Sequence, residues 1–147
     1  NDAAGVFPRL TDMGIEPFLV QSSVALAAAQ RLFKRVCTDC KEPINVPDEV
    51  LDRIQWRGFD YLDEVQFVRG RGCSRCKETG YRGRVAVIEA LLSWPELQPL
   101  VLQRASGYDI KNQAIACGMQ TLRQNGLAKA AKGLSTIEQV LEHTGHD

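Results

Sequence analysis

The spacing of apolar residues predicts a helix over about residues 18–27, after a lead-in interrupted by Gly14 and Pro17. Within it, Phe18, Leu19 and Leu26 recur at helical intervals beside small residues. Residues 29–36 fit a strand and the end of a helix about equally well, so the pattern alone leaves their structure open.

Residues 84–92 form a nearly continuous apolar run that is rich in β-branched side chains. Such a run predicts a well-buried strand. Residues 65–68 are a second strand candidate. A short helix is expected from Pro47 to about Ile54, because a proline needs no amide partner in the first turn and the acidic residues after it meet the positive end of the helix dipole.

The remainder of the chain predicts a small helical subdomain. Ser93 and Glu96 match a capping box at the start of its first helix. Gly118 and Gly133 are suitable left-handed residues for ending the second and third. The four expected helices span about residues 93–104, 108–117, 121–132 and 135–143.

Composition adds general limits. The chain has 147 residues, of which 44% are hydrophobic, and its eighteen basic and eighteen acidic side chains balance. Net charge therefore indicates neither a nucleic-acid nor a lipid partner. No apolar run approaches the roughly 18–20 residues of a transmembrane helix. The first residues resemble neither a signal nor a transit peptide, and their abrupt start suggests a piece of a longer protein.

Two Cys-x-x-Cys pairs, Cys37 with Cys40 and Cys73 with Cys76, carry the candidate chemistry. A two-residue gap lets both thiolates of a pair reach one ion, and two pairs complete a tetrahedral Zn²⁺ shell. The 32 residues between the pairs would then form a loop that the metal closes. We therefore expect one structural zinc ion in a reducing compartment, without an open position for catalysis.

Other uses of the cysteines stay open at this point. Four thiolates also bind an iron–sulfur cluster, and Cys-x-x-Cys pairs can form disulfides or carry redox chemistry. Glycines 70, 72 and 80 would let the backbone wrap close to the metal. Basic residues near the pairs are expected to donate to the sulfurs and offset their charge: Lys34, Arg35, Lys41, Arg69, Arg71, Arg75, Lys77, Arg82 and Arg84.

Three further residue types invite an interpretation. Cys117 lies beside apolar residues on an expected helix, which predicts a buried small hydrophobic side chain. His143 and His146 have no cysteine or carboxylate cluster beside them, so we expect solvated tail residues. Trp94, just before a proline, is expected to pack at a helix cap.

Short motifs along nearly the whole chain resemble the late part of the motor domain of bacterial secretion traffic ATPases, the hexameric type II secretion and type IV pilus assembly ATPases. The resemblance rests on these segments, in order: Asn1-Asp2-Ala3-Ala4-Gly5, Arg9-Leu10, Asp12-Met13-Gly14-Ile15-Glu16-Pro17-Phe18-Leu19, Ala29-Gln30-Arg31-Leu32, the two cysteine pairs with Lys41, Thr79-Gly80-Tyr81, Gly83-Arg84, Gly118-Met119, Thr121-Leu122, Gly126, Lys129, Gly133, Thr136 and Val140-Leu141.

The resemblance implies an α+β fold at the end of a RecA-like motor domain. Residues 1–36 would be its C-terminal part, and 37–83 a tetracysteine zinc module inserted between two antiparallel strands. Residues 84–92 would be the returning core strand, paired with 29–36, and 93–147 the helical subdomain. Such an insertion is tolerated when its ends stay close, because loop-closure entropy grows slowly with length.

The resemblance also implies function. The chain would be the C-terminal region of a hexameric ATPase that powers type II secretion or type IV pilus assembly. It would contact other subunits of a homohexamer and an inner-membrane platform with its secretion or pilus assembly proteins, and would be cytoplasmic and peripheral at the inner membrane. ATP and Mg²⁺ would serve the intact protein only, because no G-x-x-x-x-G-K-[S/T] phosphate loop occurs in the sequence.

No catalytic residue is therefore expected here, and the segment alone is expected to be inactive. Arg84 is the one candidate for a place near nucleotide in the intact motor; pairing with a carboxylate or the zinc shell is the alternative. Two other functions compete with the motor. A stand-alone zinc-knuckle module for nucleic acid would use the arginines around Cys73, with few aromatic stacking positions. The other alternative is a thiol redox protein, but its Cys-x-x-Cys pairs would lack the βαβ setting of thioredoxin-like proteins.

Overall fold

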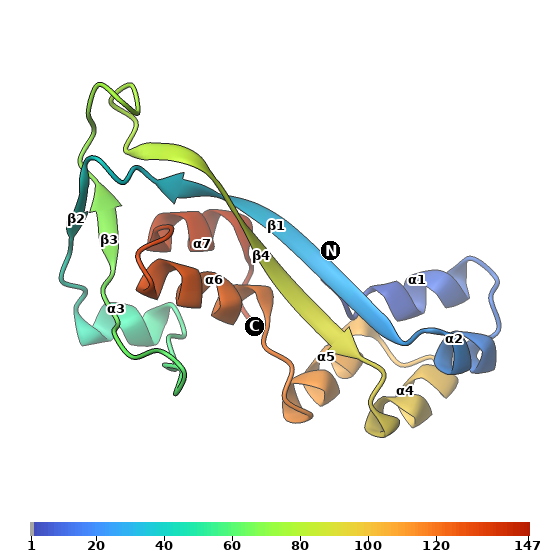
Figure 1. Ribbon diagram of the computed structural model, residues 1–147. Coiled ribbons are helices and arrows are strands. Elements are labelled where there is room, and N and C mark those ends of the chain that lie inside the picture. The colour runs from blue at the N-terminus through green and yellow to red at the C-terminus, as the bar shows by residue number, and fades with distance from the viewer. Residues whose placement is uncertain (1) are drawn as a thin grey trace. The chain divides into compact units, whose positions relative to one another are not determined.

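A computed structural model describes residues 2–147 of the chain and confirms the α+β fold (Figure 1). It contains two two-stranded antiparallel sheets, β1–β4 and β2–β3. The strands are β1 (Leu26–Val36), β2 (Lys41–Pro43), β3 (Val68–Gly70) and β4 (Tyr81–Leu92). The α-helices are α1 (Val6–Asp12), α2 (Pro17–Ser23), α3 (Asp48–Arg53), α4 (Gln98–Leu102), α5 (Gly107–Ala116), α6 (Leu122–Ala131) and α7 (Ile137–His143), with a 3₁₀ turn η1 (Pro95–Leu97).

The chain divides into two compact units. The first unit combines the residues up to Gln30 with Ile88–Thr121, and the second combines Arg31–Val87 with Leu122–Asp147. The second unit holds all four paired cysteines and the last two helices. The division of the chain into four consecutive domains stays a prediction.

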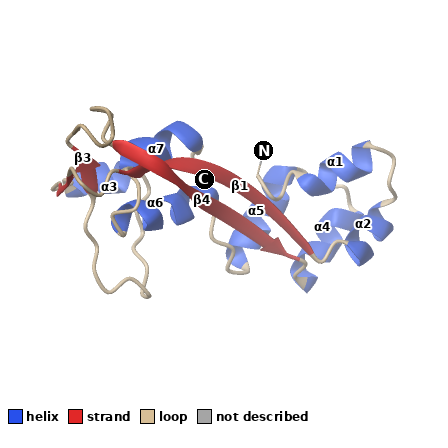
Figure 2. Ribbon diagram, turned by 45° about the horizontal axis from the view of Figure 1, so that its top comes forward, coloured by secondary structure: helices blue, strands red, loops and turns tan. Residues whose placement is uncertain are grey.

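Residues 29–36, whose structure the sequence pattern left open, belong to strand β1. This strand pairs with β4 as expected (Figure 2). The expectation that β4 is buried throughout is wrong. Val87, Glu89 and Leu91 are buried, whereas Ile88 and Leu92 are about half exposed. Neighbouring elements cover only one face of this antiparallel strand pair. Successive side chains therefore point alternately to the core and to solvent.

Helices α1, α2, α4 and α5 and the end of β4 supply much of the core of the first unit, with Phe7, Val20, Leu91 and Ile110 buried. Helix α1 was not expected from the pattern. Pro8 is its third residue, where the backbone needs no amide for the helix. The helix predicted over 18–27 ends earlier, at Ser23, because β1 begins at Leu26.

The capping box expected at Ser93 does not form. Trp94 occupies the N-cap position of η1, and no side chain caps that turn. The predicted helix is instead a 3₁₀ turn followed by the five-residue α4, since prolines stand at the start of both. Trp94 packs against the core of the first unit, which agrees with its expected role.

In the second unit, α6 ends before Gly133 and α7 begins after Thr136, close to the predicted bounds. The Thr136 hydroxyl accepts a hydrogen bond from the amide of Gln139 and caps α7. His143 is not a solvated tail residue: its ring stacks on Phe33, with centroids 5.4 Å apart. His146 is exposed.

The predicted strand at 65–68 is displaced toward the second cysteine pair. The amide of Gln66 bonds to the carbonyl of Ala131, and the carbonyl of Phe67 accepts from Ile44. Regular pairing begins only at Val68, which faces Pro43, and ends at Gly70, which faces Lys41. Helix α3 forms where Pro47 and the acidic residues predicted it.

Candidate metal centre

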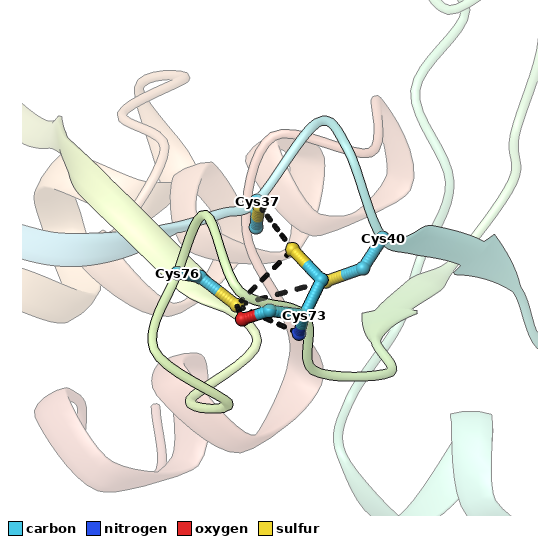
Figure 3. Close-up of side chains that lie close together, drawn as sticks. All are labelled: Cys37, Cys40, Cys73 and Cys76. Atoms are coloured by element: carbon cyan, nitrogen blue, oxygen red, sulfur yellow. Dashed lines mark hydrogen bonds between the residues drawn. The ribbon is translucent and has the colours of Figure 1, made fainter.

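The four predicted ligands come together within the second unit, next to ends of the four strands. Cys37 directly follows β1, and Cys40 directly precedes β2. Cys73 follows β3, and Cys76 lies in the turn that leads to β4. Their side chains converge from two loops (Figure 3). A metal bound here would cross-link the ends of all four strands.

The sulfur geometry fits a tetrahedral metal ion. All four Sγ atoms lie within 4.8 Å of one another. Three of the separations, Cys37 to Cys73, Cys40 to Cys76 and Cys73 to Cys76, are 3.8 Å. A tetrahedron with metal–sulfur bonds of about 2.3 Å has edges of about 3.8 Å. The spacing suits four ligands of one ion, and all four cysteines are free thiols.

Backbone amides, not basic side chains, donate to these sulfurs. The Gly72 amide lies 3.3 Å from Cys40 Sγ, and the amides of Cys73 and Gly80 lie 3.3 and 3.2 Å from Cys76 Sγ. The tight turns near Gly72 and Gly80 hold backbone amides at fixed positions beside the sulfurs. Long flexible lysine and arginine side chains are not held in place in this way. The expected lysine and arginine donors were therefore wrong for the described residues.

Several of those basic side chains have other partners. Arg69 pairs with Glu42 at 2.6 Å, and Arg75 pairs with Asp39 at 3.3 Å. Lys41 Nζ donates to the carbonyl of Gly133 at 3.1 Å. These contacts stabilise the loops around the sulfurs without touching them.

Without metal, the thiols differ in proton affinity. Burial raises the pKa of Cys40. The Gly72 amide lowers this pKa, but the other three thiols raise it, and together these effects bring it to about 12. Burial also raises the pKa of Cys76, but hydrogen bonds from the amides of Cys73 and Gly80 and from the thiols of Cys73 and Cys40 together outweigh that effect and bring it down to about 6. Cys76 therefore gives up its proton more readily than Cys40, which must lose a proton to bind a metal.

The turn between α6 and α7 holds the cysteine loops from the helical side. The amide of Val36 donates to the carbonyl of Leu134, and Ser135 Oγ donates to the carbonyl of Lys34. Tyr81 Oη and Thr136 Oγ1 are 2.8 Å apart. These contacts hold the end of β1, which leads into Cys37, and the start of β4 against the turn between α6 and α7.

Sequence reasoning missed Arg123, a buried cation on α6. Its Nε and Nη2 donate to Oγ1 and the carbonyl of Thr144 at 2.8 and 3.0 Å, and Nη1 donates to the carbonyl of Ile54 at 3.4 Å. Burial lowers the pKa of Arg123, and Asp147 partly offsets that effect. Arg123 differs from the other arginines in being buried. No pattern in the sequence predicts the burial of this arginine.

The remaining candidates lie apart from the cluster. Arg84 is exposed on β4, and the described residues offer it no ion pair. Cys117 is not a buried hydrophobic side chain: it is half-buried, with Gln113 Nε2 at 3.7 Å and Glu96 Oε2 at 3.8 Å. Among the described residues no helix is both long and apolar enough to span a membrane.

Comparison with known proteins shows which family the chain resembles. Residues 1–142 match the family described as type II/IV secretion system protein. The chain is 42% identical to the type IV pilus assembly ATPase PilB of Myxococcus xanthus over all of its 147 residues, which are 26% of that protein. It is 38% identical to the type II secretion system ATPase E of Vibrio cholerae over 98% of the chain and 28% of that protein.

The chain thus spans about a quarter of the length of these relatives. The match runs through both cysteine pairs and both compact units. The chain belongs to the type II/IV secretion system ATPase family.

Proposed function

We propose that this chain is the C-terminal region of a hexameric ATPase that powers type II protein secretion or type IV pilus assembly. The observation that carries the proposal is the family match over residues 1–142, with relatives from both systems. Because the segment has no phosphate loop, it would not hydrolyse ATP alone, and ATP and Mg²⁺ would bind in the intact protein.

The metal at the cysteine cluster would be Zn²⁺, held by Cys37, Cys40, Cys73 and Cys76. A zinc ion in such a site supplies a permanent cross-link and leaves no position for water. Two-stranded sheets are only marginally stable by themselves. The link between β1–β4 and β2–β3 would therefore make the module rigid enough to present a constant surface to partners.

Such a surface would serve the inner-membrane platform or neighbouring subunits of the hexamer, and the intact protein would act in the cytoplasm, at the inner membrane through those partners. Arg84, exposed near the start of β4, stays a candidate for a place near nucleotide in the assembled motor. No observation favours nucleic acid or thiol redox chemistry over this role.

The test uses the full-length protein in cells lacking their own copy. Substituting Cys40→Ser together with Cys73→Ser should abolish secretion or piliation while the protein is still produced. The matched control Cys117→Ser, which removes the fifth cysteine, should support both. Normal secretion and piliation by the double variant would overturn the proposed role of the module.

A further inference from the structure

The zinc module carries opposite charges at its two ends. Residues 48–64 contain two basic and six acidic side chains, for a net charge of −4: Asp48, Glu49, Asp52, Asp60, Asp63 and Glu64. Residues 69–84 contain one acidic and six basic side chains, for a net charge of +5: Arg69, Arg71, Arg75, Lys77, Arg82 and Arg84. We call these the acidic end and the basic end.

The fold keeps the two ends apart. Helix α3 and the loop after it lie beyond the Pro43–Val68 end of the β2–β3 ladder, and the second cysteine loop lies beyond the Lys41–Gly70 end (Figures 1 and 2). The short ladder thus separates two patches of opposite sign within the second unit.

Most charged side chains of the two ends lack an ion-pair partner among the described residues, although four thiolates around Zn²⁺ would leave a charge of about −2 beside the basic end. All six acidic residues of the acidic end are exposed, and among the described residues none of them forms an ion pair. At the basic end, Arg69 and Arg75 pair with Glu42 and Asp39, whereas Arg71, Lys77 and Arg82 are exposed without such a partner. The helix dipole accounts for Asp48 and Glu49 in the first turn of α3.

No helix end accounts for Asp60, Asp63 and Glu64, which lie in the loop beside exposed Tyr61. This loop already attracts a cation from its own chain, since Lys132 Nζ lies 5.4 Å from the centre of the Tyr61 ring. The acidic end is therefore suited to contact further lysine or arginine side chains.

A ring of identical subunits needs two different, mutually complementary patches on each subunit, because its interfaces are heterologous. We propose that the acidic end of one subunit's zinc module contacts the basic end of the next subunit's module. The occupant of each patch is thus a second copy of this chain. The inference rests on the proposed hexameric motor and extends it by naming the contact.

The full-length protein offers a test by charge reversal. In variant A, Asp60→Lys, Asp63→Lys and Glu64→Lys change the acidic end from −4 to +2, so both ends are basic. In variant B, Arg71→Glu, Lys77→Glu and Arg82→Glu change the basic end from +5 to −1, so both ends are acidic. Each variant alone should assemble about tenfold or more weakly, because like charges meet at every contact. A one-to-one mixture of A and B should form alternating hexamers and recover most of the lost affinity, since opposite charges again face each other at every contact.

Asp12→Lys, Glu16→Lys and Glu138→Lys, at exposed positions outside the two ends, change the net charge as much as variant A does, and this control should assemble normally. Zinc content and unfolding temperature of all variants should match the unmodified protein, and assembly is read by sedimentation. If A and B alone form hexamers as readily as the unmodified protein, or if their mixture fails to recover, the contact is wrong while the motor stands. If the unmodified protein forms no hexamer, the proposed function and the contact both fall.

Discussion

Gly70 and Gly80 approach each other so closely that neither position has room for a side chain. A Cβ atom on Gly70 would collide with the carbonyl group of Gly80, and one on Gly80 would lie 2.5 Å from the carbonyl oxygen of Gly70. Gly80 also has a φ of +81° and donates its amide to Cys76 Sγ. This contact lets the end of β3 pass beside the turn that carries a metal ligand.

We therefore expect Gly70→Ala to force the two loops apart and to destabilise the second unit by about 3 kcal/mol. Zinc affinity should fall as well, because Cys73 and Cys76 would move relative to Cys37 and Cys40. Urea unfolding and zinc titration measure both effects. Gly145→Ala is the matched control, since nothing lies within 4 Å of a Cβ there. Equal stability of the two variants would contradict the importance of the close approach.

Removing one sulfur should release the metal. Cys37→Ser replaces a fully buried ligand, and the other three thiolates cannot complete the tetrahedron. We expect the bound zinc to fall from one ion per chain to none, with earlier unfolding of the second unit. Metal analysis and thermal unfolding check this. Cys117→Ser, outside the cluster, should keep its zinc; loss of zinc from that variant instead would show that the ligand set is misassigned.

Zinc affinity should rise with pH. The pKa of Cys40 in the metal-free protein is about 12, so at neutral pH this thiol is protonated and must release its proton to the solvent when zinc binds. Each proton released changes the affinity by about tenfold per pH unit. Competition with a chromophoric chelator between about pH 6 and pH 8 measures the slope. An affinity independent of pH would contradict thiolate ligation.

Buried Arg123 should contribute to the stability of the second unit. Arg123→Met leaves the carbonyl groups of Thr144 and Ile54 without their donor, at a cost of about 2 kcal/mol. Hydrogen exchange should also quicken in residues 144–147. Arg9→Met, at an exposed position of α1, should change neither quantity. If the two variants unfold at the same urea concentration, the hydrogen bonds of Arg123 are not stabilising.

Glu89 provides a test in the first unit. This buried carboxylate on β4 accepts the amide of Ala3 at 2.9 Å. Glu89→Leu leaves that amide without this acceptor and should cost about 2 kcal/mol. Glu89→Gln keeps a carbonyl oxygen in place and should recover part of the loss in urea unfolding. A glutamine variant no more stable than the leucine variant would show that the acceptor is unimportant.

The sequence predicted the parts of the fold that local chemistry determines. Pro47 marks the start of α3, Gly118 and Gly133 end their helices, and the two cysteine pairs meet as expected. These outcomes depend on backbone conformation or ligand spacing within a few residues, which a single sequence records.

Contacts between distant segments could not be predicted in this way. Ile88 resembles its buried neighbours Val87 and Leu91 in sequence, yet only the packing of other elements decides which face of β4 is covered. The amide donors at Gly72 and Gly80 likewise depend on how the second loop folds around the sulfurs, because a backbone group has no sequence pattern of its own.

The central claim is that one zinc ion joins the four strand ends through four sulfurs. X-ray absorption at the zinc edge of the purified protein, with metal analysis of the same sample, tests it most directly. We predict one zinc ion per chain with four sulfur neighbours at about 2.3 Å and no nitrogen or oxygen ligand. A protein without zinc, or a shell in which light atoms replace one or more sulfurs, would contradict the account.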